Sequence, residues 1–313
     1  MDDLELIPVE DIKATKDMTV DQLLRFMGKA GGFTAQKLAD ATDIVETMTK
    51  DKGCLKILSF PACIMATGTR GVIVDMVRNN MVDLIITTCG TLDHDISRTF
   101  AQYYKGDFAM DDEWLRDEHE ISRLGNVLVP DECYGYVLED NLLPMFEEIF
   151  KDTDCLSTHE IIDAVGSRMG CEDSLLYQCH KNRVPIVVPG ITDGSFGCQL
   201  WTYYQTHRKL RIDLFKDEQM LSEITNHAES TGAIIVGGGI SKHHVIWWNQ
   251  FRGGLDYCIY LTTADEYDGS LSGARIKEAV SWGKVKKDAK KMTVEGDATI
   301  SLPMIYAGVL SRL

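Results

Sequence analysis

Glycines accompanied by Asp, Thr or Ser recur directly after short apolar runs in this sequence. They form the segments CGT at 89–91, GITDG at 190–194, GGG at 237–239, TADEYDG at 263–269 and GDA at 296–298. Glycine lets a backbone approach a ligand closely, and the N–H groups at a helix start bind phosphate. Asp and Thr side chains can hydrogen-bond to ribose hydroxyls. Five such turns predict a nucleotide site, but the absence of GxGxxG and of GxxxxGK[ST] leaves the nucleotide undecided and disfavours an ATPase or kinase.

A pair of histidines, His243 and His244, follows the triple glycine. Neighbouring side chains on a helix point roughly 100° apart, so the pair cannot readily chelate one metal ion. Both rings could serve only packing and polar contacts. Their place after a predicted strand end favours one ring as a proton carrier that faces a ligand cleft. No Cys and His residues elsewhere have the spacing of metal ligands, so no metal site is predicted.

Five lysines lie close together near the C-terminal end of the chain: Lys284, Lys286, Lys287, Lys290 and Lys291. Such a cluster is usually the solvated edge of a strand. A nucleophilic lysine must instead be partly desolvated, so that its amine is neutral near pH 7. Lys284 differs from its neighbours because it follows Trp282-Gly283, where an indole can exclude water and a glycine can turn the backbone inward. The residues alone favour the solvated edge and single out Lys284 as the candidate nucleophile.

The elements that must position these residues alternate along the chain. Apolar runs of strand length lie at 55–60, 84–88, 127–129, 184–189, 233–236, 257–262 and 292–295, and helix-like stretches lie at 70–80, 199–208, 217–230, 244–251 and 276–282. This alternation predicts the α/β class, with a Rossmann-like parallel sheet covered by helices on both faces. Ligands bind at the carboxyl ends of such strands. Residues 1–50 are predicted as an N-terminal helical extension and residues 51–313 as one catalytic domain.

The composition excludes several functional classes. A net charge of −16 over 313 residues argues against a nucleic-acid partner. No apolar run is long enough to span a membrane, and the N-terminal sequence lacks the pattern of a signal peptide. The nine cysteines include no CxxC pair, which is typical of reduced thiols in a cytoplasm. The sequence therefore predicts a cytoplasmic enzyme without a membrane or nucleic-acid partner.

Several segments resemble the deoxyhypusine synthase family. VGGGISKHH at 236–244, TTADEYDGSLSGARIKEAVSWGK at 262–284 and EGDA at 295–298 are similar to signature segments of that family. TDGSFG, NMVDLIITTCG and RLGNVLVP are similar to its upstream segments and stand in the same order. The resemblance runs from about Leu55 to the C-terminus, and ISKHHVIWWNQF looks most like archaeal members.

The resemblance implies an NAD-dependent transferase that moves the aminobutyl group of spermidine onto a lysine of translation factor 5A. It implies that Lys284 carries a covalent imine and that His243 relays protons. Further residues of the polyamine pocket would be Asp93, Tyr260, Gly269, Ser270, Glu278 and Trp282. Residues that would bind NAD are Thr88, Cys89, Gly90, Asp193, Gly238, Thr263, Ala264, Asp297 and Ala298. Members of the family form homotetramers with active sites at a subunit interface, so a homotetramer is expected.

The sequence departs from the eukaryotic pattern of the family at several positions. Cys198 and Leu271 stand where eukaryotic members carry aspartates of the polyamine pocket, and Trp247 stands where they carry asparagine. Pro61-Ala62-Cys63 replaces a Thr-Ser-Asn that helps to hold the cofactor. The donor is therefore open between spermidine and another amine such as agmatine.

Two further alternatives stay open. One is a homospermidine synthase-type enzyme, in which putrescine is the acceptor. The other is a catalytically silent NAD-binding subunit that partners an active paralogue. The presence of Lys284, Glu278 and Trp282 argues against the silent subunit.

Overall fold

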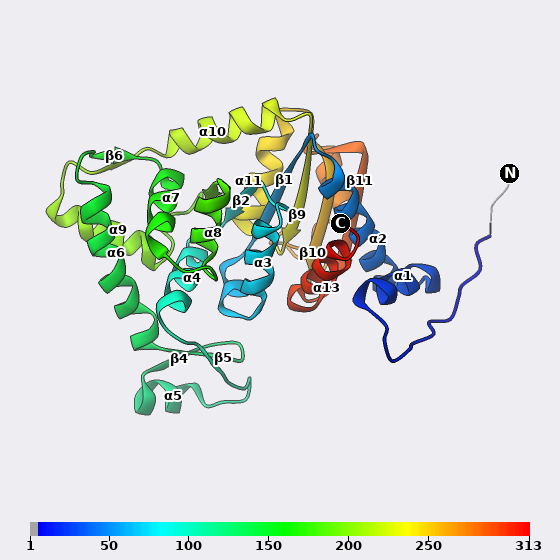
Figure 1. Ribbon diagram of the computed structural model, residues 1–313, viewed down its shortest axis with the longest axis horizontal. Coiled ribbons are helices and arrows are strands. Elements are labelled where there is room, and N and C mark those ends of the chain that lie inside the picture. Colours follow the sequence, from blue (N-terminus) through cyan, green and yellow to red (C-terminus); the bar gives the residue numbers. More distant parts are fainter. Residues whose placement is uncertain (1–5) are drawn as a thin grey trace.

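A six-stranded parallel sheet forms the centre of the computed structural model, which describes residues 6–313 (Figure 1). The strand order is β11-β10-β9-β1-β2-β7, and every neighbouring pair is parallel. The strands are β1 (Cys54–Phe60), β2 (Leu84–Thr87), β7 (Ile186–Val187), β9 (Ser230–Val236), β10 (Leu255–Thr262) and β11 (Val285–Glu295). The predicted α/β class with a Rossmann-like parallel sheet is confirmed.

The order of the strands reverses at β1. From β1 the chain adds β2 and β7 on one side, and then returns to add β9, β10 and β11 on the other side. Ile57 of β1 is accordingly paired with Leu84 of β2 and with Ala233 of β9. In open α/β sheets the crevice at such a switch point, at the carboxyl ends of the strands, binds ligands.

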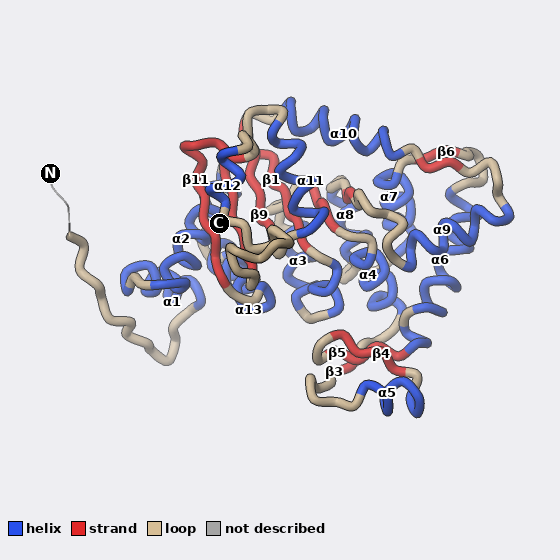
Figure 2. Tube along the Cα trace, turned by 180° about the vertical axis from the view of Figure 1, so that it is seen from behind, coloured by secondary structure: helices blue, strands red, loops and turns tan. Residues whose placement is uncertain are grey.

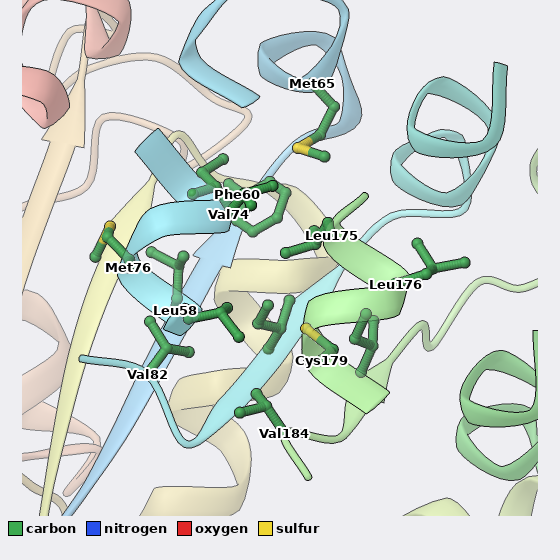
Figure 3. Close-up of a cluster of buried hydrophobic side chains, with 14 of the residues drawn as sticks. Leu58, Phe60, Met65, Val74, Met76, Val82, Leu175, Leu176, Cys179 and Val184 are labelled. Carbon is green, nitrogen blue, oxygen red and sulfur yellow. The ribbon is translucent and has the colours of Figure 1, made fainter. Parts of the chain in front are cut away.

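Helices cover both faces of the sheet because side chains alternate along each strand. Leu58, Ile234 and Ile259 point to one face and contribute to the larger core cluster. This face is covered by α2 (Phe33–Lys50), α3 (Thr69–Arg78), α8 (Leu175–Asn182) and α13 (Ala298–Leu310), and Figure 3 shows side chains of α3 and α8 around Leu58 and Phe60. Ile57, Ile235 and Tyr260 point to the opposite face, under α10 (Leu214–His227), α11 (Gly239–Gln250) and α12 (Ile276–Ser281) (Figure 2).

Further elements complete this part of the chain, and most of them lie on the side of the sheet that is away from α2 (Figure 1). They are η1 (Ala62–Ala66), α4 (Gly90–Phe100), η2 (Asp131–Cys133), α6 (Gly135–Ile149), β6 (Cys155–Leu156), α7 (Thr158–Met169), α9 (Ser195–Thr206) and β8 (Arg211–Ile212). The predicted helical stretches fall in α3, α9, α10, α11 and α12. Three of these helices, α9, α10 and α11, begin three or more residues earlier than predicted. The glycine-rich turns before α9 and α11 lead directly into the first helical turn, and the Asp213 side chain caps α10.

The run at 127–129 was predicted as a strand of the parallel sheet, and this is wrong. It lies in β5 (Val127–Pro130), the middle strand of a separate antiparallel sheet with β3 (Tyr104–Lys105) and β4 (Ile121–Leu124). Gly125, with φ of +63°, and Asn126 join β4 to β5 in a tight hairpin. With α5 (Asp112–His119), this sheet forms an arm that projects from the rest of the molecule (Figure 2).

Two helices precede the first strand. Helix α1 (Val20–Ala30) begins at Thr19, whose side chain forms a capping box with Gln22. Helix α2 places Val45 and Met48 in the larger core cluster. Residues 1–5 of the predicted N-terminal extension lie outside the described residues, and the division of the chain at residue 50 stays a prediction.

Candidate active site

A pocket of about 610 Å³ lies between α11, α12 and the loop at 263–275 that joins β10 to α12. Six of the residues expected for the amine reaction line it, although they come from three separate segments: His243, Tyr260, Ser270, Glu278, Trp282 and Lys284. Gly269 directly precedes Ser270 in the loop. The structure thus brings together residues that the sequence spreads over more than forty positions.

Lys284 lies in the turn between α12 and β11. Its N–H donates to the carbonyl of Ala279, and its own carbonyl accepts from the N–H of Leu255. Gly283 has a φ of +70°, a conformation that glycine adopts without steric strain, and this turn directs Lys284 into the pocket. The Lys284 Nζ lies 5.5 Å from the ring centroid of Trp282. An aromatic face at this distance attracts a cation and excludes water from one side of the amine.

The two adjacent histidines have different surroundings. His243 lines the pocket, and its ring stacks on Trp247 with 5.8 Å between the centroids. Partial burial and the charge of Lys284 lower the pKa of His243, so its imidazole is neutral near pH 7 and can accept a proton. His244 instead accepts a hydrogen bond from the Trp248 Nε1 at 3.3 Å, and burial lowers its pKa to about 4.

Tyr260 has a hydroxyl group that is free to bind a ligand. The side chain is only 1% exposed, and the hydroxyl oxygen finds no hydrogen-bond partner among residues 6–313. A buried hydroxyl without a partner is unfavourable. Because Tyr260 lines the pocket, a polar ligand there could satisfy it.

Two cationic residues of the pocket, Lys242 and Arg275, were not identified from the sequence. Lys242 lies one residue before His243 and is only 6% exposed. Arg275 pairs with Glu295 at 2.7 Å. Local sequence gives no signal for either residue, because a lysine or arginine near a helix start is usually solvated.

The residues expected to bind the cofactor lie along the carboxyl edge of the sheet. Thr88, Cys89 and Gly90 follow β2, Asp193 follows β7, Gly238 follows β9, Thr263 and Ala264 follow β10, and Asp297 and Ala298 follow β11. A Cβ added to Gly239 would meet no atom within 4 Å, so the start of α11 is open to a ligand. The N–H groups there suit a phosphate, and the Asp and Thr side chains suit hydroxyl groups. This set of groups fits a nucleotide cofactor.

Cys89 and Asp93 lie beneath this edge and not at its surface. The Cys89 thiol donates to the carbonyl of Ile191 at 3.0 Å, and burial raises its pKa to about 12. Asp93, which is fully buried, accepts hydrogen bonds from the N–H groups of Ser195 and Phe196 at 2.9 and 2.7 Å. The structure therefore does not bring Asp93 into the amine pocket; the carboxylate caps α9 and holds the turn that carries Asp193.

Only some of the positions that depart from the eukaryotic pattern lie in the pocket. Leu271 and Trp247 line the pocket, whereas Cys198 is exposed on α9 and is not among the lining residues.

No group of His, Cys, Asp and Glu side chains within residues 6–313 is arranged to hold a metal ion. Within the same range, no helix is both long and apolar enough to cross a membrane.

Comparisons with known proteins agree over nearly the whole chain. The family model described as deoxyhypusine synthase matches residues 22–309. A "probable deoxyhypusine synthase" of Picrophilus torridus is 50% identical over 312 residues, which cover 99% of this chain and all of that protein. Proteins of the same name from Thermoplasma acidophilum and Ignicoccus hospitalis are 49% and 46% identical and cover 99% and 98% of this chain, and the matches span 100% and 96% of those proteins.

Solved structures share the fold at lower identity. The crystal structure of an Entamoeba histolytica protein assigned as a deoxyhypusine synthase superposes with a TM-score of 0.68 at 20% identity, covering 96% of this chain and 97% of that chain. Unliganded AgrE superposes with a TM-score of 0.55 at 12% identity, and the match covers 91% of this chain but only 34% of AgrE.

Proposed function

The chain belongs to the deoxyhypusine synthase family, and on this basis we propose that it uses NAD to transfer the aminobutyl group of spermidine to a lysine of translation factor 5A. The observation that carries the proposal is the placement of Lys284 beside Trp282 and His243 in one pocket. A lysine nucleophile needs a site that is partly shielded from water and a nearby group that can take its proton. The pocket provides both.

Four of the lining residues take part in this reaction: Glu278, Trp282, His243 and Lys284. Glu278 attracts an ammonium group of the donor, and the Trp282 face stabilises a cationic amine. The neutral His243 accepts the proton that an attacking amine must lose. Lys284 forms an imine with the oxidised four-carbon unit as 1,3-diaminopropane leaves, and the acceptor lysine then displaces Lys284. NAD, when bound, supplies the hydride acceptor for the first oxidation and the hydride donor for the last reduction.

The carboxyl edge of the sheet would hold the cofactor. We expect the glycines that start α11 to approach the phosphates, and Thr88, Asp193, Thr263 and Asp297 to bind hydroxyl groups. Cys89 and Asp93 would act from below by fixing the turns that carry these groups. Gly239 and Ser270 line the neighbouring end of the amine pocket, so a cofactor bound at this edge would lie next to the amine.

The proposed enzyme acts as a homotetramer in the cytoplasm. Large apolar side chains are exposed around the amine pocket, among them Trp282 at 65%, Leu271 at 56% and Trp247 at 41%. A partner subunit that covered them would also exclude water from the reaction. All nine cysteines are free thiols, which is typical of a reducing compartment.

Borohydride trapping tests the proposal. The protein is incubated with spermidine and NAD, reduced with borohydride and mapped by peptide mass spectrometry. We expect a four-carbon amine adduct on Lys284, none in Lys284→Arg, and an unchanged yield in Lys287→Arg as the matched control. An adduct on another lysine, or none at all, contradicts the proposal.

Comparing amines and acceptors separates the alternatives. Labelled spermidine and labelled agmatine are each offered with translation factor 5A or with putrescine. We expect label from spermidine on the protein acceptor. Label that appears only in homospermidine would favour the homospermidine synthase-type reaction. Label that is transferred from agmatine and not from spermidine would show that agmatine is the donor.

A further inference from the structure

Lys242 is a buried lysine in the wall of the amine pocket that the proposed reaction does not use. Its side chain lies under the loop at 263–275, and only 6% of the residue is exposed. A buried ammonium group is strongly unfavourable unless hydrogen bonds or other attractive contacts replace its water. The contacts of Lys242 therefore indicate what it does.

The Lys242 amine is directed at the loop. The Nζ donates to the carbonyls of Leu271 and Ala274 at 3.2 and 3.4 Å. It also lies 4.3 Å from the ring centroid of Tyr260, close enough for a cation–π interaction. The N–H groups of Lys242 thus donate within the protein, whereas Lys284 faces the open pocket. These contacts fit Lys242 as an anchor of the loop and Lys284 as the lysine that reacts.

The loop that Lys242 holds contacts both parts of the site. It carries Ser270, Leu271 and Arg275, which line the amine pocket. A second inward anchor comes from Thr262, whose hydroxyl donates to the carbonyl of Ser272 at 3.2 Å. Ser272 packs directly on the glycine turn, because a Cβ added to Gly238 would lie 2.7 Å from the Ser272 Cα. The loop therefore lies across the start of α11, next to the proposed phosphate site.

The loop is not held by its own backbone geometry alone. Leu271 has a φ of +60°, which is unfavourable for a residue with a branched side chain. Two donors converge on its carbonyl, the Lys242 Nζ and the N–H of Ala274. Removing the lysine would leave a strained residue with one of these bonds.

We propose that Lys242 is a positioning residue, whose ammonium group fixes the loop at 263–275 as the shared wall of the amine pocket and the cofactor edge. It acts through the loop and not on the reacting atoms. Its effect on catalysis rests on the proposed function, whereas its effect on the loop does not. The experiment therefore measures the two effects separately in the full-length protein.

Amide hydrogen exchange measures the effect on the loop. Lys242→Met keeps the length of the side chain and removes its charge and donors. Losing buried hydrogen bonds of this kind should speed exchange in the peptide covering 263–275 by about tenfold, without a change in the sheet. Lys291→Met is the matched control, because the Lys291 Nζ also donates to two carbonyls, those of Lys287 and Ala289, but on β11. It should leave the loop unchanged.

Steady-state kinetics and borohydride trapping measure the effect on the reaction. We expect the KM for spermidine in Lys242→Met to rise about tenfold, with kcat within about threefold and the Lys284 adduct still formed at saturating amine. Lys242→Gln, which keeps a donor but no charge, should lie between wild type and Lys242→Met in both measurements. If Lys242→Met does not fold, both measurements are made on Lys242→Gln instead.

Two results would overturn the proposal. Unchanged exchange in the loop would show that Lys242 does not hold it. A collapse of kcat and of the Lys284 adduct, with no change in KM, would show that Lys242 acts on the reacting atoms. If the wild-type protein forms no adduct at all, the proposed function fails, and loop exchange alone still decides the role of Lys242.

Discussion

The charges around the pocket bear on which amine it accepts. The lining residues include the cationic side chains Lys242, Arg275 and Lys284, whereas Glu278 is the one carboxylate among them. Leu271, where eukaryotic members of the family have an aspartate, adds an apolar side chain to this wall. A donor with several ammonium groups therefore finds few partners in a single chain. This balance favours donors of lower charge unless a partner subunit supplies further carboxylates.

Leu271→Asp should improve the binding of spermidine. The new carboxylate would face the pocket and lower the KM for spermidine by about tenfold, since a charge-assisted contact contributes about 1.5 kcal/mol. Asp also tolerates the φ of +60° at this position better than Leu does. Steady-state kinetics with spermidine and agmatine measures the change.

The control is Leu271→Asn, which provides the same shape and the same backbone relief without the charge. It should leave the KM for spermidine close to that of the wild type. An equal gain in both variants would mean that backbone relief, and not charge, limits binding at this position.

Residue types alone identified only part of the pocket. The context Trp282-Gly283 singled out Lys284, and the structure shows the positive φ of Gly283 and the proximity of the indole that this context implied. The other four lysines of the cluster lie on the edge strand β11, as a solvated edge predicts. Lys242 was missed because burial is decided by a loop that lies some thirty positions further along the chain.

At the scale of elements, buried carboxylates fix the helix starts around the site. Asp93 and Asp95 on α4 point to different neighbours: Asp93 caps α9, and Asp95 accepts from the N–H groups of Leu175 and Leu176 at the start of α8. Arg70 pairs with Asp95 at 2.7 Å. Helix α4 thus sets the positions of two helices, and one of them leads out of the turn that carries Asp193.

Asp93→Asn should destabilise the fold. An amide keeps one acceptor oxygen but turns an NH2 group toward donors, so at least one buried hydrogen bond is lost, at about 2 kcal/mol. Urea unfolding measures the loss. Asp111→Asn is the control, because Asp111 caps α5 through Glu113 and Trp114 on the exposed arm, and it should change stability by less than about 1 kcal/mol. Equal losses in the two variants would contradict a special role for the buried cap.

Strands and helices were predicted well where the pattern is local. Short apolar runs predicted the strands of the parallel sheet, and amphipathic stretches predicted five helices. Both kinds of prediction depend only on the periodicity of apolar residues within one segment. The run at 127–129 was misplaced because its apolar residues are equally compatible with either sheet. Its partner is decided by the hairpin at Gly125-Asn126, a feature of chain geometry rather than of hydrophobicity.

At the scale of the whole molecule, the C-terminal segment is joined to the two helices that precede the first strand. Arg312 follows α13, and its side chain is only 4% exposed. It pairs with Asp21 of α1 and with Asp43 and Glu46 of α2, at 2.5, 2.6 and 2.9 Å. The N-terminal helices are therefore held to the end of the catalytic region by one buried guanidinium group with three acidic partners.

Arg312→Met should lower the free energy of unfolding by about 3 kcal/mol, because it leaves three carboxylates close together without their buried cation. Arg25→Met is the matched control: Arg25 also pairs with Asp21, but its side chain is 58% exposed, so the loss should stay below about 1 kcal/mol. Equal losses of unfolding free energy in the two variants would contradict the idea that burial makes the Arg312 contacts strong.

Calorimetry of Arg312→Met also tests the division predicted at residue 50. A separate unit at 1–50 should then melt in a transition of its own, below that of the sheet. A single transition at a lower temperature would mean that α1 and α2 unfold together with the catalytic region, and the division would be wrong.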